Sequence, residues 1–427
     1  MALLVSFWVG ILTSAQVRAQ PPEPHDMQHM AMDDNRTALL PGRDGSGTSW
    51  LPDESPMYAV HGQAGPWTLM AHGVAFLQYL NESGARGADQ AGSINWAMGM
   101  AARRLGNGRL TLRGMISLEP LTIGDCGYPD LLSTGEQCKG ETIHDRQHPH
   151  DLFMELAAAY DRPLAGGIRW QVYGGPVGEP ALGPTAFPHR ISAMASPLAP
   201  ITHHWFDSTH VTFGVITGGI YGNRWKTEAS VFNGREPDDH RTDFDFGRLD
   251  SWSGRVWFLP TSRWALQVSA GHLSEAEAGQ TGEPRIDVDR FTASATYHKT
   301  LKTGGIWAST LGWGRNKEPL TNATNALLAE TSVTLHDRDA WFGRVELSQK
   351  SADDLAVAST GIFVVAKLQA GYTRYIGSWK RLRPGAGVAV SAGIVPETLR
   401  PFYGRRANLG VGVYATIRPG NAGAHRN

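Results

Sequence analysis

The stretch WKTEASV, from Trp225 to Val231, alternates apolar or small residues with charged or hydroxyl-bearing ones. Side chains of a β-strand point alternately to opposite faces, so Trp225 and Val231 would share one face and Lys226 and Glu228 the other. A strand with one face in lipid and one in water has this pattern. The same alternation returns in Arg109–Leu118, Phe291–His298 and Trp341–Ser348.

The spacing of such segments distinguishes a membrane barrel from a soluble β-sandwich, whose strands also alternate. Between Trp67 and Pro419 we count about sixteen segments, and the gaps between them are alternately long and short. Outer-membrane barrels have short periplasmic turns and long outer loops. We therefore predict an all-β fold, a transmembrane antiparallel up-and-down β-barrel of about 16 strands, with 14 or 18 as alternatives. Leu121–Asp151 and Gly178–Phe206 would be outer loops.

The composition agrees with a single barrel. A chain of 427 residues could make two or three soluble domains, but one barrel accounts for it more simply. No run of eighteen apolar residues follows the N-terminus, so the sequence predicts no transmembrane helix. Its 50 glycines and 14 tryptophans suit tight turns and aromatic girdles. A net charge of -1 without basic runs gives no indication of nucleic-acid binding.

Four segments follow from these patterns. Residues 1–19 are expected to be a signal peptide, with an apolar run and cleavage after Ala19, although no Lys or Arg precedes that run. Residues 20–60, rich in Pro, Asp, Met and Gly, are expected to form a flexible periplasmic arm. The barrel would span 61–419, and a short tail, 420–427, would end the chain.

The two cysteines, Cys126 and Cys138, both lie in the second predicted outer loop. Export places them in an oxidising compartment, so we expect a disulfide between them. The alternative is a pair of free thiols that act as soft metal ligands.

The arm contains the sequence PHDMQHMAM, which is rich in thioether and imidazole groups. Thioether sulfur favours Cu(I), and imidazole accepts both copper oxidation states, so the arm could capture copper or silver. The alternative is a polar tail without a binding role. The candidate ligands are His25, Met27, His29, Met30 and Met32.

Three consecutive outer loops contain a second group of histidines, in HDRQHPHD, PITHHWFDSTH and REPDDHR. Neutral imidazole and carboxylate bind zinc, copper or nickel where loops converge. The alternative is a hydrogen-bonded network that caps the pore. The candidate ligands are His144, His148, His150, His203, His204, His210 and His240.

The lumen face of the predicted barrel carries more basic than acidic residues, which would mildly favour anions in an open channel. The alternative is a set of paired charges that fill the lumen. These residues are Arg109, Arg113, Arg169, Lys226, Arg255, Arg344, Lys367, Glu155, Glu228 and Glu346.

An enzyme is a third hypothesis, because Asp207, Ser208 and His210 are the residue types of a hydrolase triad. Outer-membrane lipases present Ser and His toward lipid. If Val211, Phe213 and Val215 form the apolar face of a strand, Ser208 and His210 point into the lumen, which is the wrong direction for a phospholipase. We therefore expect no enzymatic activity.

Several motifs resemble a family of bacterial secreted or outer-membrane proteins that is largely uncharacterised. They are WLPDESPM, DRQHPHDLFMELA, EPALGP, PITHHWFDSTH and GREPDDHR, between Trp50 and Arg241. The resemblance implies a Met/His-rich N-terminus and genes near copper and heavy-metal efflux systems. In layout, a Met/His-rich arm before a barrel, the chain is also similar to outer-membrane copper-resistance protein B.

From residues and resemblance together, we expect a non-enzymatic outer-membrane barrel that handles copper or another heavy metal, with its arm in the periplasm. Its partners would be outer-membrane lipid, metal ions or small solutes, and periplasmic efflux components. The alternative is a general or solute-specific porin with structural histidine loops. A lipid-active enzyme is the third reading.

Overall fold

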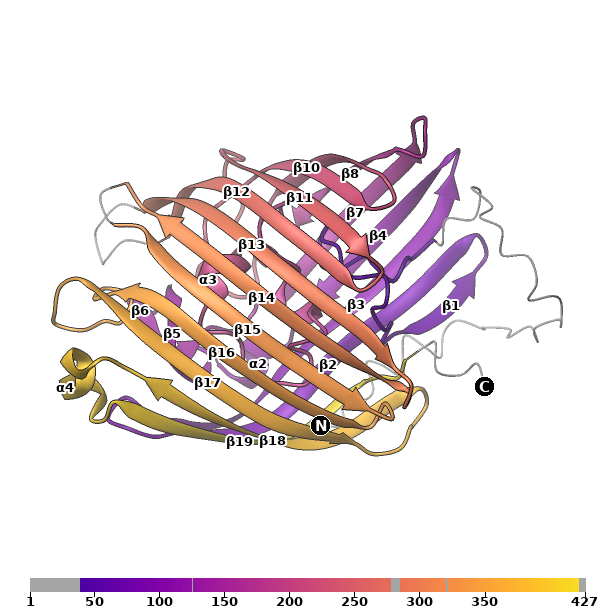
Figure 1. The fold of residues 1–427 in the computed structure, drawn as a ribbon. Coiled ribbons are helices and arrows are strands. Elements are labelled where there is room, and N and C mark those ends of the chain that lie inside the picture. Colours follow the sequence, from indigo (N-terminus) through magenta and orange to yellow (C-terminus); the bar gives the residue numbers. More distant parts are fainter. Residues whose placement is uncertain (1–38, 125, 278–284, 320–321, 422–427) are drawn as a thin grey trace.

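The computed structural model describes residues 39–124, 126–277, 285–319 and 322–421. Sixteen antiparallel strands form a closed ring, which confirms the predicted fold: β2 to β4 and β7 to β19 pair in chain order, and β19 closes on β2. Figure 1 shows the tilted strands of this ring. The strands are β2 (Trp67–Glu82), β3 (Asp89–Leu105), β4 (Gly108–Ile116), β7 (Phe153–Pro163), β8 (Arg169–Val177), β9 (Val215–Tyr221), β10 (Trp225–Phe232), β11 (Ser251–Thr261), β12 (Trp264–Glu277), β13 (Ile286–Leu301), β14 (Gly305–Lys317), β15 (Thr324–Leu335), β16 (Asp339–Ser351), β17 (Ile362–Tyr375), β18 (Leu382–Ile394) and β19 (Ala407–Pro419).

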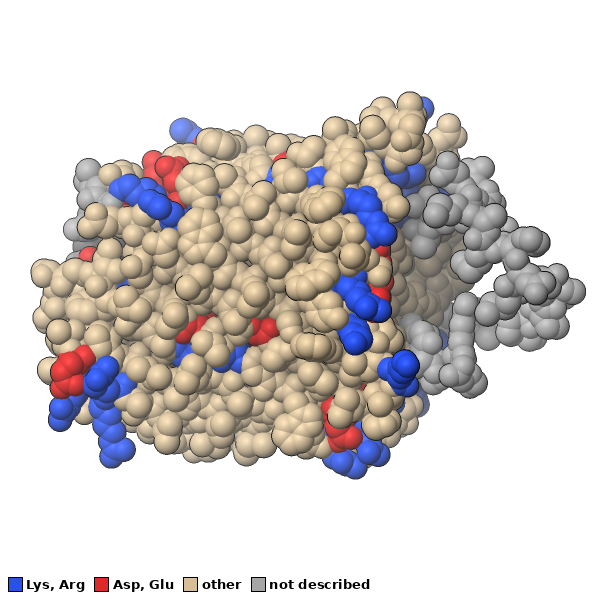
Figure 2. Space-filling view, viewed as in Figure 1, with Lys and Arg blue, Asp and Glu red and all other residues tan. Residues whose placement is uncertain are grey.

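The two faces of the wall follow the alternation in the sequence. In β10, Trp225 and Val231 are exposed on the outside, whereas Lys226 and Glu228 are buried in the lumen. Strand β16 repeats this pattern. Figure 2 shows that charged side chains gather mainly toward the two ends of the outer surface. Apolar residues of the outer face include Leu77, Val172, Ile216, Trp252, Val256, Phe258, Val268, Leu311, Leu327, Val345, Val364, Val390, Val411 and Val413.

Aromatic residues gather on the outer face near the short turns. The ring centroids of Trp264 and Tyr297 are 4.9 Å apart, and those of Tyr297 and Trp307 are 5.5 Å apart. Trp341 and Tyr372 form a third pair, at 4.4 Å. Such a band suits the boundary between hydrocarbon and lipid headgroups. Among the described residues, no helix is long and apolar enough to span a bilayer.

The long loops, which lie at the opposite end of the barrel from the short turns, contain their own secondary structure. Residues 117–152, here called loop 2, contain a hairpin that the sequence did not predict, and the disulfide between Cys126 and Cys138 closes it. Residues 178–214, here called loop 3, contain three short helices. The elements are α2 (Glu119–Thr122), β5 (Tyr128–Cys138) and β6 (Glu141–Gln147) in loop 2, η1 (Phe187–His189), α3 (His203–Phe206) and η2 (Ser208–His210) in loop 3, and η3 (Glu397–Leu399) and α4 (Arg400–Tyr403) in the last loop.

Loops 2 and 3 fold into the barrel and fill much of its lumen. Figure 1 shows α2 and α3 within the ring of strands. Leu131 and Leu132 of loop 2 pack with Ile201 of loop 3 in a buried apolar cluster. Trp205 and Phe206 of α3 pack on the lumen side of β15. The protein's own loops therefore occupy much of the lumen.

The N-terminal segment differs from the predicted arm. Trp50 is 4% exposed, and the Thr48 and Gly47 carbonyls accept hydrogen bonds from Lys226 and Arg113 of the wall. Residues 39–59 therefore lie inside the barrel toward the short turns, and the prediction of a loose arm is wrong for them. Strand β1 (Val60–Ala64) then pairs with β2. The predicted signal peptide and residues 20–38 lie outside the described residues.

Strand β9 corrects one predicted face. It begins at Val215 rather than near Phe206, because loop 3 continues to Gly214, whose φ is +107°. Val215 is buried against Tyr173 on the lumen side, and Ile216 is 53% exposed on the outside. Val211, Phe213 and Val215 therefore do not form a lipid-facing stripe.

Candidate metal centre

Loops 2 and 3 bring five histidines together inside the lumen. His148 and His150 follow β6 in loop 2, whereas His203 and His204 lie on α3 and His210 on η2 of loop 3. All five are buried, with 2% to 9% of each residue exposed. We call these five residues the histidine cluster.

The barrel wall holds the part of loop 3 that carries α3. Glu346 of β16 accepts hydrogen bonds from the backbone nitrogen and hydroxyl of Thr202, at 3.1 and 2.8 Å. Arg190 bridges Asp207 at the end of α3 to Glu330 of β15, at 2.6 and 2.7 Å. Because both ends of this short helix are tied to charged groups, its two imidazoles have fixed positions before any ligand binds.

The five rings contact one another. The ring centroid of His203 lies 5.3 Å from that of His204, 5.1 Å from that of His210 and 5.8 Å from that of His148. The rings of His150 and His210 are 5.2 Å apart. His148, His203 and His204 each offer one ligand atom, and these three atoms lie within 4.8 Å of one another. A cation between them could bind all three after small shifts of the rings.

Four of the five rings share one hydrogen-bonding pattern. Each Nδ1 contacts an oxygen, whereas each Nε2 is buried and has no hydrogen-bond partner in the described structure. The Nδ1 contacts are His150 to Glu119 Oε2 at 2.9 Å, His203 to Asp207 Oδ1 at 2.8 Å, His204 to Glu236 Oε1 at 2.9 Å, and His210 to the Asp207 carbonyl at 2.7 Å.

This pattern is the one that metal-binding histidines adopt in proteins. An imidazole whose Nδ1–H donates to a carboxylate or carbonyl keeps its lone pair on Nε2, where a metal can bind. A buried polar atom without a partner costs about 1–3 kcal/mol. Four such atoms in one cluster are unlike the ordinary interior of a protein, where buried polar groups are paired.

Burial keeps three of the rings neutral. It lowers the pKa of His203 to about 4, and it lowers the pKa of both His148 and His210 well below the usual range. Burial would also lower the pKa of His150 and His204, but the carboxylates of Glu119 and Glu236 outweigh it, so both pKa values are raised. Neutral rings have the free lone pair that a metal needs, whereas His150 and His204 would give up a proton on binding.

His148 belongs to a separate ion-pair network. Its Nε2 lies 3.2 Å from Glu136 Oε1, and Arg241 contacts Glu136 at 2.5 Å and Asp151 at 3.7 Å. Burial raises the pKa of Asp151 to about 8. Loop 4, residues 233–250, therefore contributes a cation that balances these carboxyl groups.

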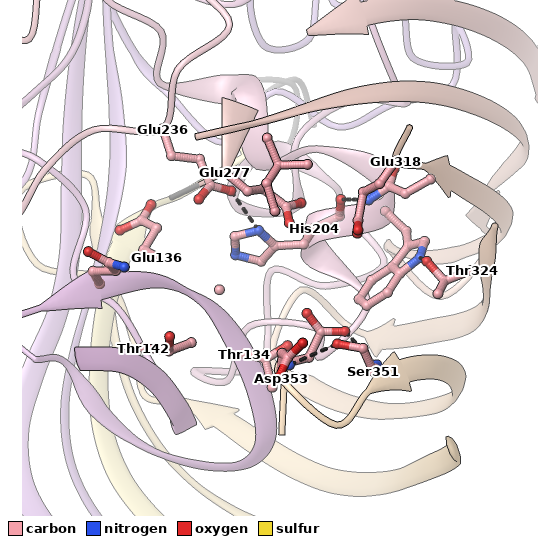
Figure 3. A pocket seen from close by; sticks show the side chains of 16 residues that line it. Thr134, Glu136, Thr142, His204, Glu236, Glu277, Glu318, Thr324, Ser351 and Asp353 are labelled. Atoms are coloured by element: carbon pink, nitrogen blue, oxygen red, sulfur yellow. Dashed lines mark hydrogen bonds and ion pairs between the residues drawn. The ribbon is translucent and has the colours of Figure 1, made fainter. Parts of the chain in front are cut away.

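A pocket of about 150 Å³ opens beside the cluster, and His204 forms part of its lining. Figure 3 shows His204 pointing toward this pocket, with a dashed line to Glu236. Gly135 packs against the His204 ring so closely that a Cβ there would overlap it. The acidic residues that line the pocket are Glu136, Glu236, Glu277, Glu318, Asp353 and Asp354.

Two predicted ligands do not join the cluster. His144 lies on β6 with a 41% exposed side chain, near Asp145 and Arg86. The side chain of His240 is 76% exposed and lies beside Asp238. The metal candidates of the N-terminal arm, His25, Met27, His29, Met30 and Met32, lie outside the described residues.

The predicted lumen charges point inward, and they form ion pairs or hydrogen bonds. Their geometry agrees with the reading in which paired charges fill the lumen. The contacts are Arg109 and Arg169 with Asp161, Arg113 with Glu155, Lys226 and Arg255 with Glu228, Arg344 with Glu330, Lys367 with Glu82 and Asp130, and Glu346 with Thr202.

The hydrolase residues have other partners. The Ser208 hydroxyl accepts a hydrogen bond from Arg290 at 2.8 Å, and His210 Nδ1 contacts the Asp207 carbonyl. Asp207 instead binds His203 and Arg190. These residues therefore lack the contacts of a nucleophile and its base.

Sequence reasoning did not identify the carboxylates that orient the rings. Glu119 lies on α2 and Glu236 in loop 4, far in sequence from His150 and His204. Neither occurs at a motif spacing, because the Glu119–His150 contact forms only when loop 2 folds back on itself and the Glu236–His204 contact only when loops 3 and 4 meet in the lumen. The motif REPDDHR contains Glu236, but in the sequence its histidine, His240, is the stronger candidate for a metal ligand.

The ring of strands, the apolar outer face and the inward-folded loops define an outer-membrane barrel of the porin type. No protein-family model and no curated protein matches the chain. OprB of Pseudomonas putida, solved at high pH, is similar in structure, with a TM-score of 0.50 and 7% identity over 82% of this chain and 94% of that one. The anion-selective porin of Comamonas acidovorans has a TM-score of 0.49 and 13% sequence identity, over 83% of this chain and 99% of that one. At 7% identity, the likeness to OprB shows the fold alone.

Proposed function

We propose that this protein is a non-enzymatic outer-membrane barrel that handles copper or another heavy metal by binding the cation at its histidine cluster. The observation that carries the proposal is the set of four buried Nε2 atoms without partners, on rings whose Nδ1 atoms contact oxygens. A metal held by His148, His203 and His204 would give a partner to two of these rings, His203 and His204.

The ligand chemistry favours a late first-row divalent cation. Imidazole nitrogen suits Cu²⁺, Zn²⁺ and Ni²⁺, whereas Mg²⁺ and Ca²⁺ prefer oxygen ligands. Both cysteines are in the disulfide, so no thiolate competes as a ligand. Glu136 lies within reach of His148 and could complete the coordination.

The acidic pocket beside His204 supports the same proposal. Six carboxyl groups around one opening would attract cations and raise their local concentration at the entrance to the cluster. The resemblance to proteins encoded near efflux systems agrees with a role in metal resistance, and periplasmic efflux components are the partners we propose.

A porin is the second candidate, and the overall fold favours it. In that reading the loops are structural and a solute passes through the barrel. The paired lumen charges and the inward-folded loops argue for a low conductance. Planar-bilayer recording tests this: we expect no steady open channel in the wild-type protein, and a large ohmic conductance in every insertion would favour the porin.

Calorimetric titration of the full-length protein in detergent tests metal binding. We expect Cu²⁺ or Zn²⁺ to bind, and the double variant His203→Gln/His204→Gln to bind at least about 100-fold more weakly, because it loses two ligands. His336→Asn is the matched control: His336 is exposed in a turn at a φ of +54°, which Asn tolerates. Equal affinity in all three proteins would contradict the proposal.

A further inference from the structure

A second group of possible ligands lies beneath the histidine cluster, on the side of the N-terminal segment. Met115, Met154, His189 and His210 line a small cavity there, with Gly47 of that segment. The cavity measures about 10 Å³, roughly the minimum for one water molecule or one metal ion. His210 belongs to both places, because its ring also contacts His203 at 5.1 Å.

The cavity brings nitrogen and sulfur groups together, and one of the nitrogens lacks a partner. His210 Nε2 is buried without a hydrogen-bond partner. Met115 and Met154 are 3% and 1% exposed, so their side chains are shielded from water. His189 lines the same cavity.

A buried carboxyl group also lines the cavity. Neither oxygen of Glu179 has a hydrogen-bond partner in the described structure, and its contact with Arg255 is 3.7 Å long. A cation in the cavity would give these two oxygens a partner.

Sulfur and imidazole groups continue on the far side of His189. His72 Nε2 lies 3.0 Å from Met98 Sδ, and the His72 and His189 rings are 5.5 Å apart. Methionines often fill gaps in apolar cores, which is the ordinary explanation for such residues. Here, however, they share the lumen of a barrel with neutral imidazoles. Four of the chain's eleven methionines, Met98, Met100, Met115 and Met154, belong to one buried hydrophobic cluster, and Met70 packs against it.

We propose that the cavity lined by Met115, Met154, His189 and His210 is a second metal site, which binds a soft monovalent cation, Cu(I) or Ag(I). Thioether sulfur and imidazole are the ligands that such cations prefer, and the carboxyl groups of Glu155 and Glu179 also line the cavity. The divalent cation of the histidine cluster and the monovalent cation of this cavity would thus occupy neighbouring sites that share His210. The proposal concerns binding only and requires no change of oxidation state.

X-ray absorption spectroscopy of the full-length protein loaded with Cu(I) under anaerobic conditions tests the proposal. Met27, Met30 and Met32 are first replaced by Leu, so that sulfur scattering comes from the lumen. We expect a Cu–S shell in this protein. The substitutions Met115→Leu/Met154→Leu, which nearly conserve volume, should remove the shell and weaken Cu(I) binding at least about tenfold.

Met194→Leu, in loop 3 outside the cavity, is the control and should keep the sulfur shell. The second site would be overturned if the protein with Met115 and Met154 intact shows no Cu–S shell. It would also be overturned if the shell remains after both are replaced by Leu. Calorimetry with Zn²⁺ on the same variants separates this outcome from failure of the proposed function. Zn²⁺ binding should persist in Met115→Leu/Met154→Leu. If a Cu–S shell is seen but no protein binds Zn²⁺, the divalent site at the histidine cluster is rejected and the second site stands.

Discussion

The ion pairs of Lys367 and Arg255 differ from the histidine cluster in how their buried nitrogen atoms are partnered, although wall strands also hold single buried atoms without partners, such as Ser253 Oγ and Gln369 Nε2. Lys367 of β17 contacts Glu82 of β2 and Asp130 of the loop 2 hairpin at 3.0 and 2.6 Å, and Arg255 contacts Glu228 at 2.9 Å. In the cluster, the Nε2 atoms of His203 and His204 remain without partners. Paired charges fix structure, whereas unpaired donors at fixed positions can accept a ligand. The difference assigns stability to the wall and binding to the loops.

The largest expected effect comes from breaking a wall pair. Lys367→Met would leave the carboxylates of Glu82 and Asp130 buried without their cation, so we expect a loss of about 3–5 kcal/mol in the free energy of unfolding. Denaturant titration of the refolded barrel measures it. Lys302→Met, at an exposed turn position, is the control and should change little. An unaltered midpoint in Lys367→Met would show that the wall pairs do not carry stability.

A smaller effect should follow from removing a carboxylate that orients the cluster. Glu236→Gln leaves the ligands of the cluster in place but weakens the hold on His204 Nδ1. We expect metal affinity to fall about 10–100-fold, with the unfolding midpoint nearly unchanged. Calorimetry and denaturant titration on one preparation check both. A large loss of stability with unaltered affinity would reverse the roles that we assign to wall and cluster.

The metal affinity of the histidine cluster should depend on pH. Because the pKa of His204 is raised, a metal that binds this ring must displace a proton, and metal affinity should fall as pH drops through that raised pKa, by about tenfold per pH unit for the proton released. Titrations at several pH values measure this slope. His204→Gln should reduce the slope by one proton, and a slope unchanged by that substitution would argue that His204 is not a ligand.

The stability of the metal-free protein should change with pH in the opposite direction, because His204 is then protonated at low pH. The folded-state pKa of His204 is above its unfolded value, so the ion pair with Glu236 stabilises the fold below pH 6.5, and this contribution is lost as pH rises through the raised pKa. The rise in melting temperature on adding metal should therefore be larger at pH 8 than at pH 6. Thermal melts with and without Zn²⁺ check the difference, and an equal rise at both values would contradict it.

The wall could be predicted from sequence because a period of two residues and the length of each gap are local properties. The faces of Trp225 and Lys226 follow from alternation alone. The predicted face of Val215 was wrong. The loop residues up to Gly214 alternate like a strand, but β9 begins at Val215 with its side chain toward the lumen.

The interior could be predicted only in part. The residues His148, His150, His203, His204 and His210 were candidates because of their density in two loops. Yet His144, four residues before His148, lies apart from them, because β6 ends at Gln147 and only the chain beyond it turns into the cluster. Residues 39–59 were not predicted either, since their composition resembles a linker and their order comes from contacts with distant parts of the chain, such as Lys226 and Arg113.

The most direct test of the central claim is anomalous diffraction at the metal absorption edge from crystals of the full-length protein loaded with Cu²⁺ or Zn²⁺. We expect a strong anomalous-difference peak between His148, His203 and His204, within bonding distance of their nitrogens. A lumen without a peak, or a metal bound only at the exposed Asp238, Asp239 and His240, would contradict it.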